Sequence, residues 1–401
     1  MTATILITLC SLLLIAYVFD LTSSRTRIPS VLLLLLLGWL VREASSFFDI
    51  EIPSLSRFLP FLGTIGLVLI VLDGSLELEF NGSKKTVIKK SFLLALIPMV
   101  LLAFLIAFLF MQLGENFTLS ESLMNAIPFC VISSAVAISS VKGLSTGDSE
   151  FIVYESSFSD ILGVLFFNFI TLNSVVNMHS IGLFGLHLII IALISFFASL
   201  GLSYLLSNIQ HPIKFVPIVL LLMLIYAISE VFELPALIFI LLFGLFLGNL
   251  DELKRFKWVQ RLRPRELDIE VHKFKDLIRE ITFLIRALFF LVFGFVLKRQ
   301  EILNPETILL AIGIVIAIYL FRLIVIRLLK LPFKPLFFIA PRGLITILLF
   351  LAIAPERILP FVNRSLVIQV IVLTSLTMMG GFMESKNNKL KRLITRQQAN
   401  Q

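Results

Sequence analysis

Long apolar runs recur along almost the whole chain and limit its possible folds more than any other feature. A helix needs roughly 20 mostly apolar residues to cross a bilayer, and hydropathy with turn signals gives about thirteen candidate spans. Of the 401 residues, 58% are hydrophobic and 15% are charged, which excludes the soluble globular classes. We therefore predict an all-α polytopic membrane protein. The candidate spans are approximately residues 4–19, 29–42, 57–76, 91–113, 121–143, 150–172, 183–207, 214–231, 234–249, 281–298, 306–329, 335–354 and 364–383.

Charged residues between the runs predict the orientation of the chain. The formal net charge of +8 does not indicate nucleic-acid binding, because the basic residues gather in alternate connections, as the positive-inside rule requires. This pattern predicts an outside N-terminus and a cytoplasmic C-terminus, in a bacterial inner (plasma) membrane. The predicted inner connections contain Arg25, Arg27, Lys84, Lys85, Lys89, Lys90, Lys142, Lys214, residues 254–279, Arg327, Lys330, Lys334 and the tail after Glu384, whereas the outer ones contain Glu115, Glu121, Glu230 and Glu233.

Few features point to chemistry outside the apolar runs. The segment Asp251–Glu280 is dense in charges of both signs, which is typical of either a solvated linker or a regulatory, membrane-surface helix. The two cysteines, Cys10 and Cys130, suggest neither a disulfide nor a metal site. The sequence has no metal-ligand cluster, activated nucleophile or cofactor motif. We therefore expect no enzyme and no cofactor, and we interpret the first apolar run as a retained helix.

Two acids, Glu155 and Asp160, interrupt the apolar run at 150–172. A charge at the centre of a spanning helix costs about 2.5–3.5 kcal/mol, so these acids need partners, water or a function. Helical spacing places Ser156, Ser159 and Asp160 on one face together with Gly163. Their hard oxygens suit a small cation. Glu155 lies about 140° round the helix from Asp160 and should have another partner; the alternative is that both acids are simply satisfied and buried.

Two spans carry signals of a broken helix. The span at 121–143 contains Asn125-Ala-Ile-Pro128 and then Ser133-Ser134, although serines also bond harmlessly to their own helix. The span at 335–354 contains Pro341-Arg342-Gly343, in which proline removes a backbone bond and glycine loosens the helix. In the predicted topology the two spans run in opposite directions. They indicate an inverted repeat, in which half-helix ends point at ions near the midplane.

Three further charged residues lie within or near the end of apolar runs. Arg322 is deep in its run and should pair with an acid, because arginine stays charged. Arg286 lies near the inner end of its run, where it either snorkels or pairs. Asp73 is interpreted as an acid at the interfacial end of a helix.

Several of these segments, in order along the chain, resemble motifs of the monovalent cation:proton antiporters, the sodium/proton exchangers. Glu155-Ser-Ser-Phe-Ser-Asp160 resembles their E-S-x-x-N-D segment, and Ser133–Ala137 resembles their unwound S-S-x-x-A stretch. The resemblance extends over about residues 30–383. The other matching segments are Val71–Leu78, Tyr226–Glu230 through Gly248-Asn249, Phe289–Gly294 and Pro341–Gly343.

This resemblance implies an antiporter domain at about 1–383 with a short cytoplasmic tail at 384–401. It implies a mobile core of about 91–172 and 306–383, which contains two crossing broken helices. A dimerisation scaffold of about 1–76 and 183–298 would lie beside the core, and the protein would be a homodimer. Glu155 and Arg322 fall at the positions of a core charge pair. Pro341, Arg342 and Gly343 would support the second break.

We therefore expect a secondary active antiporter that exchanges Na⁺, or another monovalent cation, for H⁺ by alternating access. Asp160 would bind either H⁺ or Na⁺, because low-dielectric surroundings disfavour a bare carboxylate. Ser156, Ser159, Ser133, Ser134 and carbonyls of the Ser133–Ala137 break would complete the ion's shell. Positions 159 and 134 are serine where the family usually has asparagine or aspartate and where many members have aspartate, respectively. Members with a neutral residue beside the ion-binding aspartate tend not to move net charge, so the neutral Ser159 implies one-for-one, electroneutral exchange. The alternatives are K⁺/H⁺ antiport and a K⁺ channel-like efflux protein.

Overall fold

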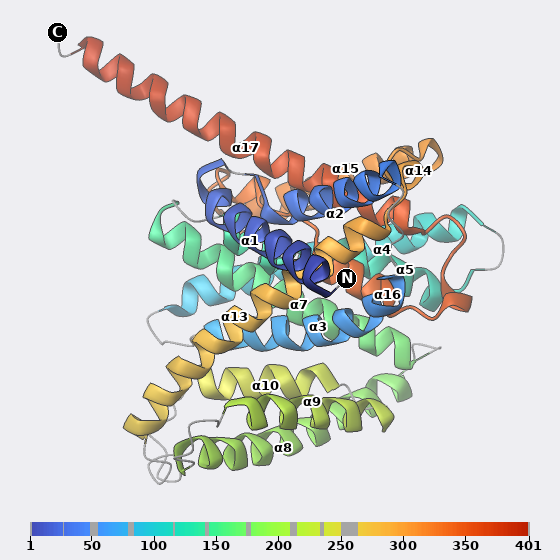
Figure 1. Cartoon of the computed structure of the whole chain (residues 1–401), viewed down its shortest axis with the longest axis vertical. Coiled ribbons are helices and arrows are strands. Elements are labelled where there is room, and N and C mark those ends of the chain that lie inside the picture. Colours follow the sequence, from blue (N-terminus) through green and yellow to red (C-terminus); the bar gives the residue numbers. More distant parts are fainter. Residues whose placement is uncertain are drawn as a thin grey trace.

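The computed structural model describes residues 2–26, 28–48, 55–78, 84–114, 117–140, 144–173, 178–208, 215–232, 236–249 and 264–399. These residues are almost entirely helical, and no strand occurs among them (Figure 1). The helices are α1 (Thr2–Thr26), α2 (Ser30–Phe47), α3 (Phe58–Glu77), α4 (Lys85–Gln112), α5 (Leu119–Cys130), α6 (Ser134–Ser140), α7 (Thr146–Leu172), α8 (Met178–Asn208), α9 (Phe215–Val231), α10 (Ala236–Gly248), α13 (Pro264–Val296), α14 (Arg299–Ile302), α15 (Pro305–Leu328), α16 (Leu344–Leu351) and α17 (Arg364–Ala399), with 3₁₀ turns η1 (Leu55–Arg57), η3 (Leu336–Phe338) and η4 (Pro355–Arg357).

Each predicted span is occupied by one helix or by an interrupted one, which confirms the all-α polytopic fold. Among the described residues, 8 helical segments are long and apolar enough to cross a membrane. Three shorter apolar helices, Ile7–Ser23, Phe215–Ser229 and Leu237–Gly248, accompany them. The connection predicted around Glu233-Leu234-Pro235 lies outside the described residues.

The structure contains both helix breaks, but the first lies earlier than predicted. The non-helical residues between α5 and α6 are Val131–Ser133, whereas Ser134–Ser140 form α6. The prediction of a break over Ser133–Ala137 was therefore wrong for its last four residues. The serine pair thus lies at the start of the second half-helix. The second break covers Ile339–Gly343, between η3 and α16.

One group of helices, here called the α13 group, consists of α1, α2, α3, α8, α9, α10 and α13. Its tightest crossing joins α2 to α13, where a methyl group on Gly38 would collide with the Leu291 carbonyl, and one on Gly294 with the Leu35 carbonyl. Glycine at these two positions lets the two backbones touch. Within this group α8, α9 and α10 lie together at the lower end of the view in Figure 1.

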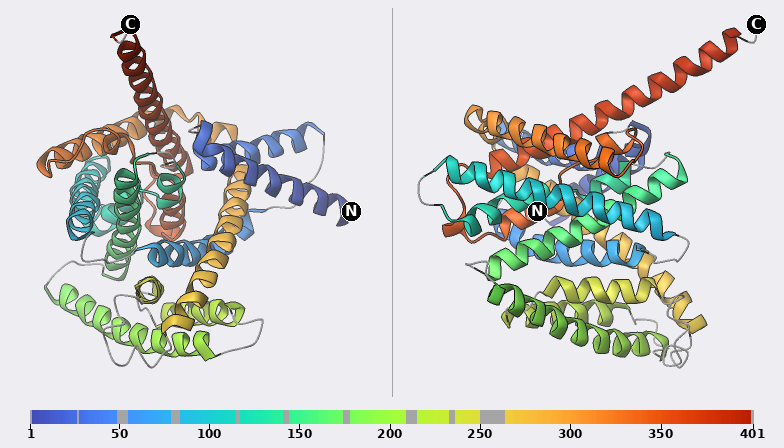
Figure 2. Two further views of the ribbon diagram at one scale, coloured as in Figure 1. Left: turned by 90° about the vertical axis from the view of Figure 1, so that its left-hand side faces the viewer. Right: turned by 180° about the vertical axis from the view of Figure 1, so that it is seen from behind.

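The remaining long helices, here called the α7 group, are α4, α5, α6, α7, α15, α16 and α17. Helix α4 packs against α5, α7 and α15, and α15 packs against α17. Figure 2 shows α4 and α7 on the opposite side of the molecule from α1, α2 and α13. The predicted division into a mobile core and a dimerisation scaffold concerns motion and assembly, and it stays a prediction.

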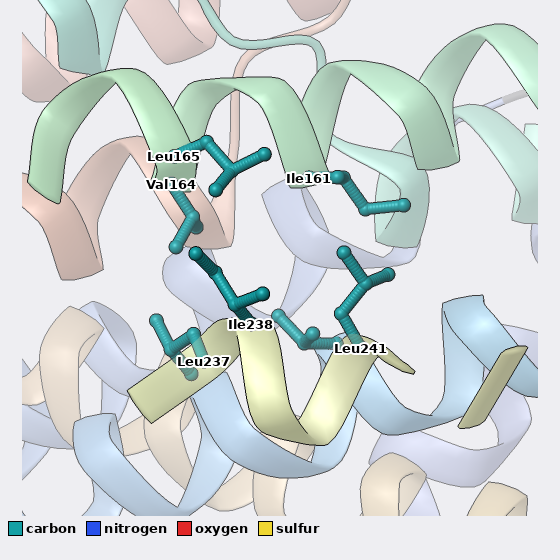
Figure 3. Close-up of a pocket in the computed structure, with 7 residues that line it drawn as sticks. Ile161, Val164, Leu165, Leu237, Ile238 and Leu241 are labelled. Atoms are coloured by element: carbon teal, nitrogen blue, oxygen red, sulfur yellow. The ribbon is translucent and has the colours of Figure 1, made fainter. Parts of the chain in front are cut away.

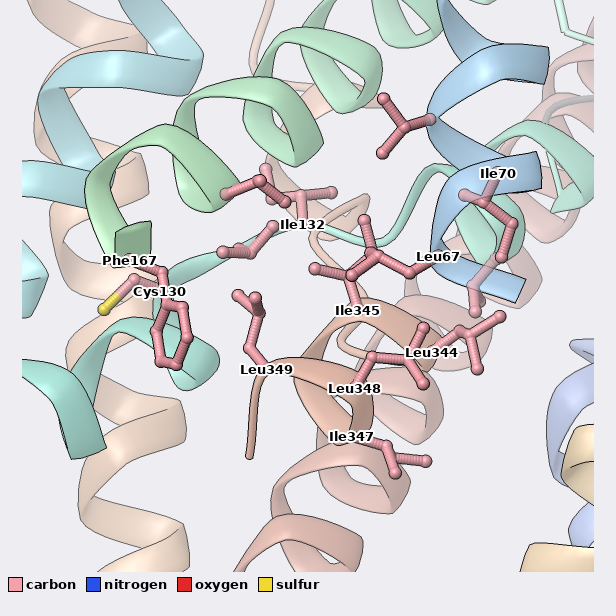
Figure 4. Packing of buried hydrophobic residues seen from close by; sticks show 14 of the residues in the cluster. Leu67, Ile70, Cys130, Ile132, Phe167, Leu344, Ile345, Ile347, Leu348 and Leu349 are labelled. Atoms are coloured by element: carbon pink, nitrogen blue, oxygen red, sulfur yellow. The ribbon is translucent and has the colours of Figure 1, made fainter. Parts of the chain in front are cut away.

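The two groups meet through aliphatic side chains. Ile161, Val164 and Leu165 of α7 face Leu237, Ile238 and Leu241 of α10 across a small apolar cavity, with Val71 of α3 beside them (Figure 3). Leu344 and Leu348 of α16 lie beside Leu67 and Ile70 of α3 (Figure 4). These contacts are aliphatic and contain no directional hydrogen bond.

The charged segment predicted at Asp251–Glu280 falls partly within a helix. Residues 251–263 lie outside the described residues, and the remainder forms the first half of α13. Val271, Phe274 and Ile278 are buried there, and the Phe274 ring lies 5.9 Å from that of Phe215. This half of α13 is therefore packed against the protein along one face. At the C-terminal end, α17 continues as helix to Ala399 through most of the predicted tail.

Candidate functional site

Helix α7 carries the two predicted acids into the interior of the molecule. Its N-cap is Ser145, whose hydroxyl accepts a bond from the Asp148 N–H. Glu155 is 1% exposed and Asp160 is 5% exposed. Ser156 and Ser159 are also buried. All the predicted site residues of this helix therefore lie inside the protein rather than toward lipid.

Residues at the first break make hydrogen bonds to Asp160 and to its neighbour Ser159. Ser134, at the start of α6, hydrogen-bonds the Asp160 carboxylate through its backbone N–H and its hydroxyl. The Ile132 N–H donates to Ser159 Oγ over 2.8 Å, which ties α7 to the same break. A methyl group on Gly163 would collide with Val131, so glycine allows this close approach.

Two oxygens at this break have no protein partner. They are Asp160 Oδ1 and Ser133 Oγ, and both atoms are buried. Buried polar atoms in proteins normally have a hydrogen-bond partner. Two buried oxygens without one therefore mark a place for water, a proton or an ion. The irregular backbone beside them is Val131–Ser133, rather than the predicted Ser133–Ala137.

The second break lies against the first. The Ser133 N–H donates to the Pro341 carbonyl over 2.9 Å. A methyl group on Gly343 would come within 2.7 Å of Ser133 Oγ. The two broken spans thus meet at their non-helical residues, as the predicted crossing requires.

Arg342 binds the C-terminal end of α5. Its Nε donates to the Phe129 carbonyl over 2.6 Å, and its Nη2 donates to the Cys130 carbonyl over 3.3 Å. Its Nη1 donates to Ala340, and its backbone N–H donates to Thr374 Oγ1. A cation at a helix C-terminus is favourable because the last carbonyls carry partial negative charge. Within the part of the chain described, Arg342 makes no ion pair, so its partners are carbonyl groups.

Glu155 and Arg322 form a buried bidentate pair. Arg322 Nη1 donates to Glu155 Oε1, and Nη2 donates to Oε2 over 3.0 Å. Both side chains are 2% exposed. The remaining Nε donates to the Leu336 carbonyl of η3 over 2.8 Å. The pair therefore connects α7, α15 and the η3 arm of the second broken span.

The hydroxyl groups predicted as ligands differ in the hydrogen bonds that they already make within the protein. Ser156 Oγ donates to the Ile152 carbonyl of its own helix over 2.8 Å, which leaves only its lone pairs for an ion. Ser159 accepts from Ile132, and Ser134 is bound to Asp160. Asp160, Ser133, Ser134 and Ser159 are brought together at the break, whereas the Ser156 hydroxyl is turned back along α7.

Two polar groups near this site were missed or given a lesser role. Ser157 Oγ is buried without a protein partner and lies 3.8 Å from the place of a methyl group on Gly74 in α3. Asp73 Oδ1, one residue earlier on α3, is also buried and without a partner. The residue as a whole is half-buried and lies four residues before the end of α3 at Glu77, near the helix end where it was predicted. Ser157 lies three residues before Asp160, about 60° round the helix from it, so helical spacing alone already indicated it as a neighbour of that acid.

Arg286 pairs rather than snorkels. Its Nη2 lies 3.4 Å from Asp20 Oδ1 of α1, and Ser30 of α2 donates to the same oxygen over 3.3 Å. The guanidinium also lies 5.9 Å from the centre of the Phe283 ring. This contact connects α1, α2 and α13, away from Asp160.

A polytopic bundle with crossed half-helices, a buried carboxylate and unpaired hard oxygens defines a class of membrane transporter for small cations. Among the described residues no cluster of His, Cys, Asp and Glu suits a resident metal ion. One carboxylate with hydroxyls and carbonyls is a donor set for a singly charged ion.

Comparison with known proteins identifies the family. Residues 10–383 match the model of the transmembrane sodium/hydrogen exchangers, and the chain belongs to that family. None of the curated protein sequences compared with the chain is similar enough to count as a relative.

Solved structures show the same fold at low sequence identity. The chain is similar to the sodium proton antiporter MjNhaP1 from Methanocaldococcus jannaschii at pH 8, with a TM-score of 0.71 and 20% identity over 95% of this chain and 100% of that one. An electron-microscopy structure of the same antiporter gives a TM-score of 0.64 and 18% identity over 96% of this chain and 95% of that one. These similarities concern the fold.

Proposed function

We propose that this membrane protein exchanges Na⁺ for H⁺ by alternating access, with Asp160 as the group that both ions bind. The observation that carries this proposal is the state of the Asp160 carboxylate. It is 5% exposed and held by Ser134, and its Oδ1 has no protein partner. Membership of the sodium/hydrogen exchanger family favours Na⁺/H⁺ exchange over K⁺/H⁺ antiport and over a K⁺ channel.

Exchange follows from competition for one carboxylate. A bare carboxylate is unfavourable in a low-dielectric interior, so Asp160 moves across the barrier only when a proton or a cation neutralises it. The two ions cannot occupy Oδ1 together, and release of one on one side allows the other to bind. Ser133 Oγ is the second buried oxygen without a partner and would be a ligand of the cation. We assign the rest of the ion's shell to Ser134, Ser156, Ser159 and the carbonyls of Val131–Ser133.

The moving unit in this proposal is the α7 group and the fixed unit is the α13 group. Aliphatic contacts between α7 and α10 support this division, since they allow sliding without loss of hydrogen bonds. The protein would be a homodimer in a bacterial inner membrane, with the N-terminus outside and the C-terminus in the cytoplasm. The charges of the connections support this orientation. The neutral side chain at Ser159 supports a one-for-one exchange.

Cation-driven proton flux in proteoliposomes tests the proposal. Addition of Na⁺ should move protons against their gradient, with Li⁺ and K⁺ compared at equal concentration. Asp160→Asn keeps the shape of the side chain and removes its charge, so flux should vanish while the variant still folds and purifies. Flux that only dissipates an imposed gradient would indicate a channel instead. Full activity of Asp160→Asn would refute the assignment of the site.

A further inference from the structure

Asn125 is a completely buried amide in the middle of half-helix α5, at 0% exposure. Its Nδ2 donates to the Glu121 carbonyl of the same helix over 2.9 Å and to the Arg357 carbonyl over 2.8 Å. Its Oδ1 accepts from the Leu359 N–H over 3.2 Å. The side chain therefore binds both a carbonyl and an N–H of one short backbone segment.

That segment belongs to the second broken span. It lies between α16 and α17 and contains only the 3₁₀ turn Pro355–Arg357. Its side chains Ile353, Leu359 and Val362 are buried, so its backbone needs partners within the protein. Asn125 supplies two of them, and the Phe361 ring packs 5.2 Å from that of Phe110 of α4. The outer end of the second broken span is thus fastened to the first.

Among the described residues, the other hydrogen bonds between the broken spans lie at the breaks. They are the Ser133 bond to Pro341 and the Arg342 bonds to Phe129 and Cys130. Half-helix α5 spans only Leu119–Cys130. Helices α4 and α7 pack along it, and the Ser120 hydroxyl donates to the Asn173 carbonyl over 3.3 Å, but these contacts do not join it to the second broken span. Loss of the Asn125 bonds would therefore let α5 pivot relative to that span. A pivot would displace Val131–Ser133, which follow α5 directly and carry the unpaired Ser133 oxygen.

We infer that Asn125 is a positioning residue that clamps the outer ends of the two crossed half-helices and so keeps the cation ligands of the first break in place. The inference rests on the proposed antiport at Asp160. Asn125 touches no ion; it acts through the orientation of α5. Loss of the clamp therefore weakens cation binding, which a loss of folded protein alone would not do.

Asn125→Ala and Asn125→Ser remove both bonds to the loop, and serine retains the bond to its own helix. The matched control is Asn173→Ala. Asn173 also lies near the outer end of a helix, but among the described residues its side chain bonds only within that helix, from Nδ2 to the Phe169 carbonyl over 2.8 Å. Each variant is reconstituted, the folded protein per vesicle is quantified, and proton flux is measured over a range of Na⁺ concentrations.

Both Asn125 variants should raise the half-saturating Na⁺ concentration by about threefold to tenfold, the range expected for loss of roughly one net hydrogen bond of positioning energy. The control should leave it unchanged. Asn125→Ser serves if the alanine variant does not fold. An unchanged half-saturating concentration, with only the maximal rate or the yield lowered, would overturn the inference. Absence of Na⁺-dependent flux in the wild-type protein would instead refute the proposed antiport.

Discussion

Removal of one partner of the Glu155–Arg322 pair should destabilise the protein severely, because the other charge stays buried. In Glu155→Ala, Arg322 loses both bonds to the carboxylate and retains only the Leu336 carbonyl. Breaking a buried pair in this way costs about 3–5 kcal/mol. For domains of 150–250 residues each kcal/mol lowers Tm by about 2–4 °C. The longer chain favours the lower value, and the expected loss is roughly 6–10 °C.

The assay is thermal unfolding of purified protein in detergent, for Glu155→Ala, Arg322→Ala and the double variant. The double variant removes both charges and leaves only cavities, so it should be more stable than the sum of the single effects predicts, by about 1–3 kcal/mol. Arg327→Ala is the matched control, because Arg327 lies on the same helix and is exposed. It should change Tm by about 1 °C or less.

Strictly additive effects of the two single substitutions would refute this account of the pair. Retention of wild-type Tm in Glu155→Ala would refute it as well. Activity per folded molecule is a separate readout, and it should fall because η3 and α7 lose their common anchor.

Three further outcomes are expected. Arg342→Leu should lower Tm by several degrees, because the Phe129 and Cys130 carbonyls lose their partner. Arg342→Lys should restore Tm only in part, since lysine has no planar fork of donors. Equal stability of both variants and the wild-type protein would contradict a stabilising role of Arg342 at the end of α5. A cysteine at Lys273, in a variant without the exposed Cys10, should react with a membrane-impermeant reagent only from the cytoplasmic side, and labelling of intact cells would reverse the proposed orientation. The rate of Na⁺/H⁺ exchange should not change under an imposed potential of about 100 mV, which acts on a net transferred charge with about 2.3 kcal/mol; a systematic shift of rate or end point would exclude one-for-one exchange.

The sequence predicted the helices well because their signal is local. Apolar runs of membrane length are recognisable without tertiary contacts. The direction of the chain, which charges in the connections indicate, stays a prediction. Pro341-Arg342-Gly343 marked the second break because proline and glycine act on their own backbone. The first break was misplaced, since serine pairs occur both at helix starts and in unwound stretches, and only packing against Gly163 and Pro341 distinguishes these cases.

Contacts between distant segments were harder to predict. Arg322 was expected to pair with an acid, because a deep arginine requires a partner, and the resemblance indicated Glu155. Nothing local indicated that Arg342 would bind the end of α5, that Asn125 would bind the loop after α16, or that Ser157 would face α3. These roles depend on which helix lies opposite, and helical spacing alone gives only the face of a residue.

The charges around the crossed helices suggest why a neutral residue at position 159 suits one-for-one exchange. Glu155 and Arg322 neutralise each other, and Arg342 binds carbonyl groups whose partial charges do not titrate. Ser159 contributes an oxygen to the Ile132 N–H, a bond that needs an acceptor but no charge. Asp160 is thus the one acid that faces the first break among the described residues. In the proposed exchange, H⁺ or Na⁺ on Asp160 would compensate the same single charge, so both half-cycles would carry equal charge across the membrane.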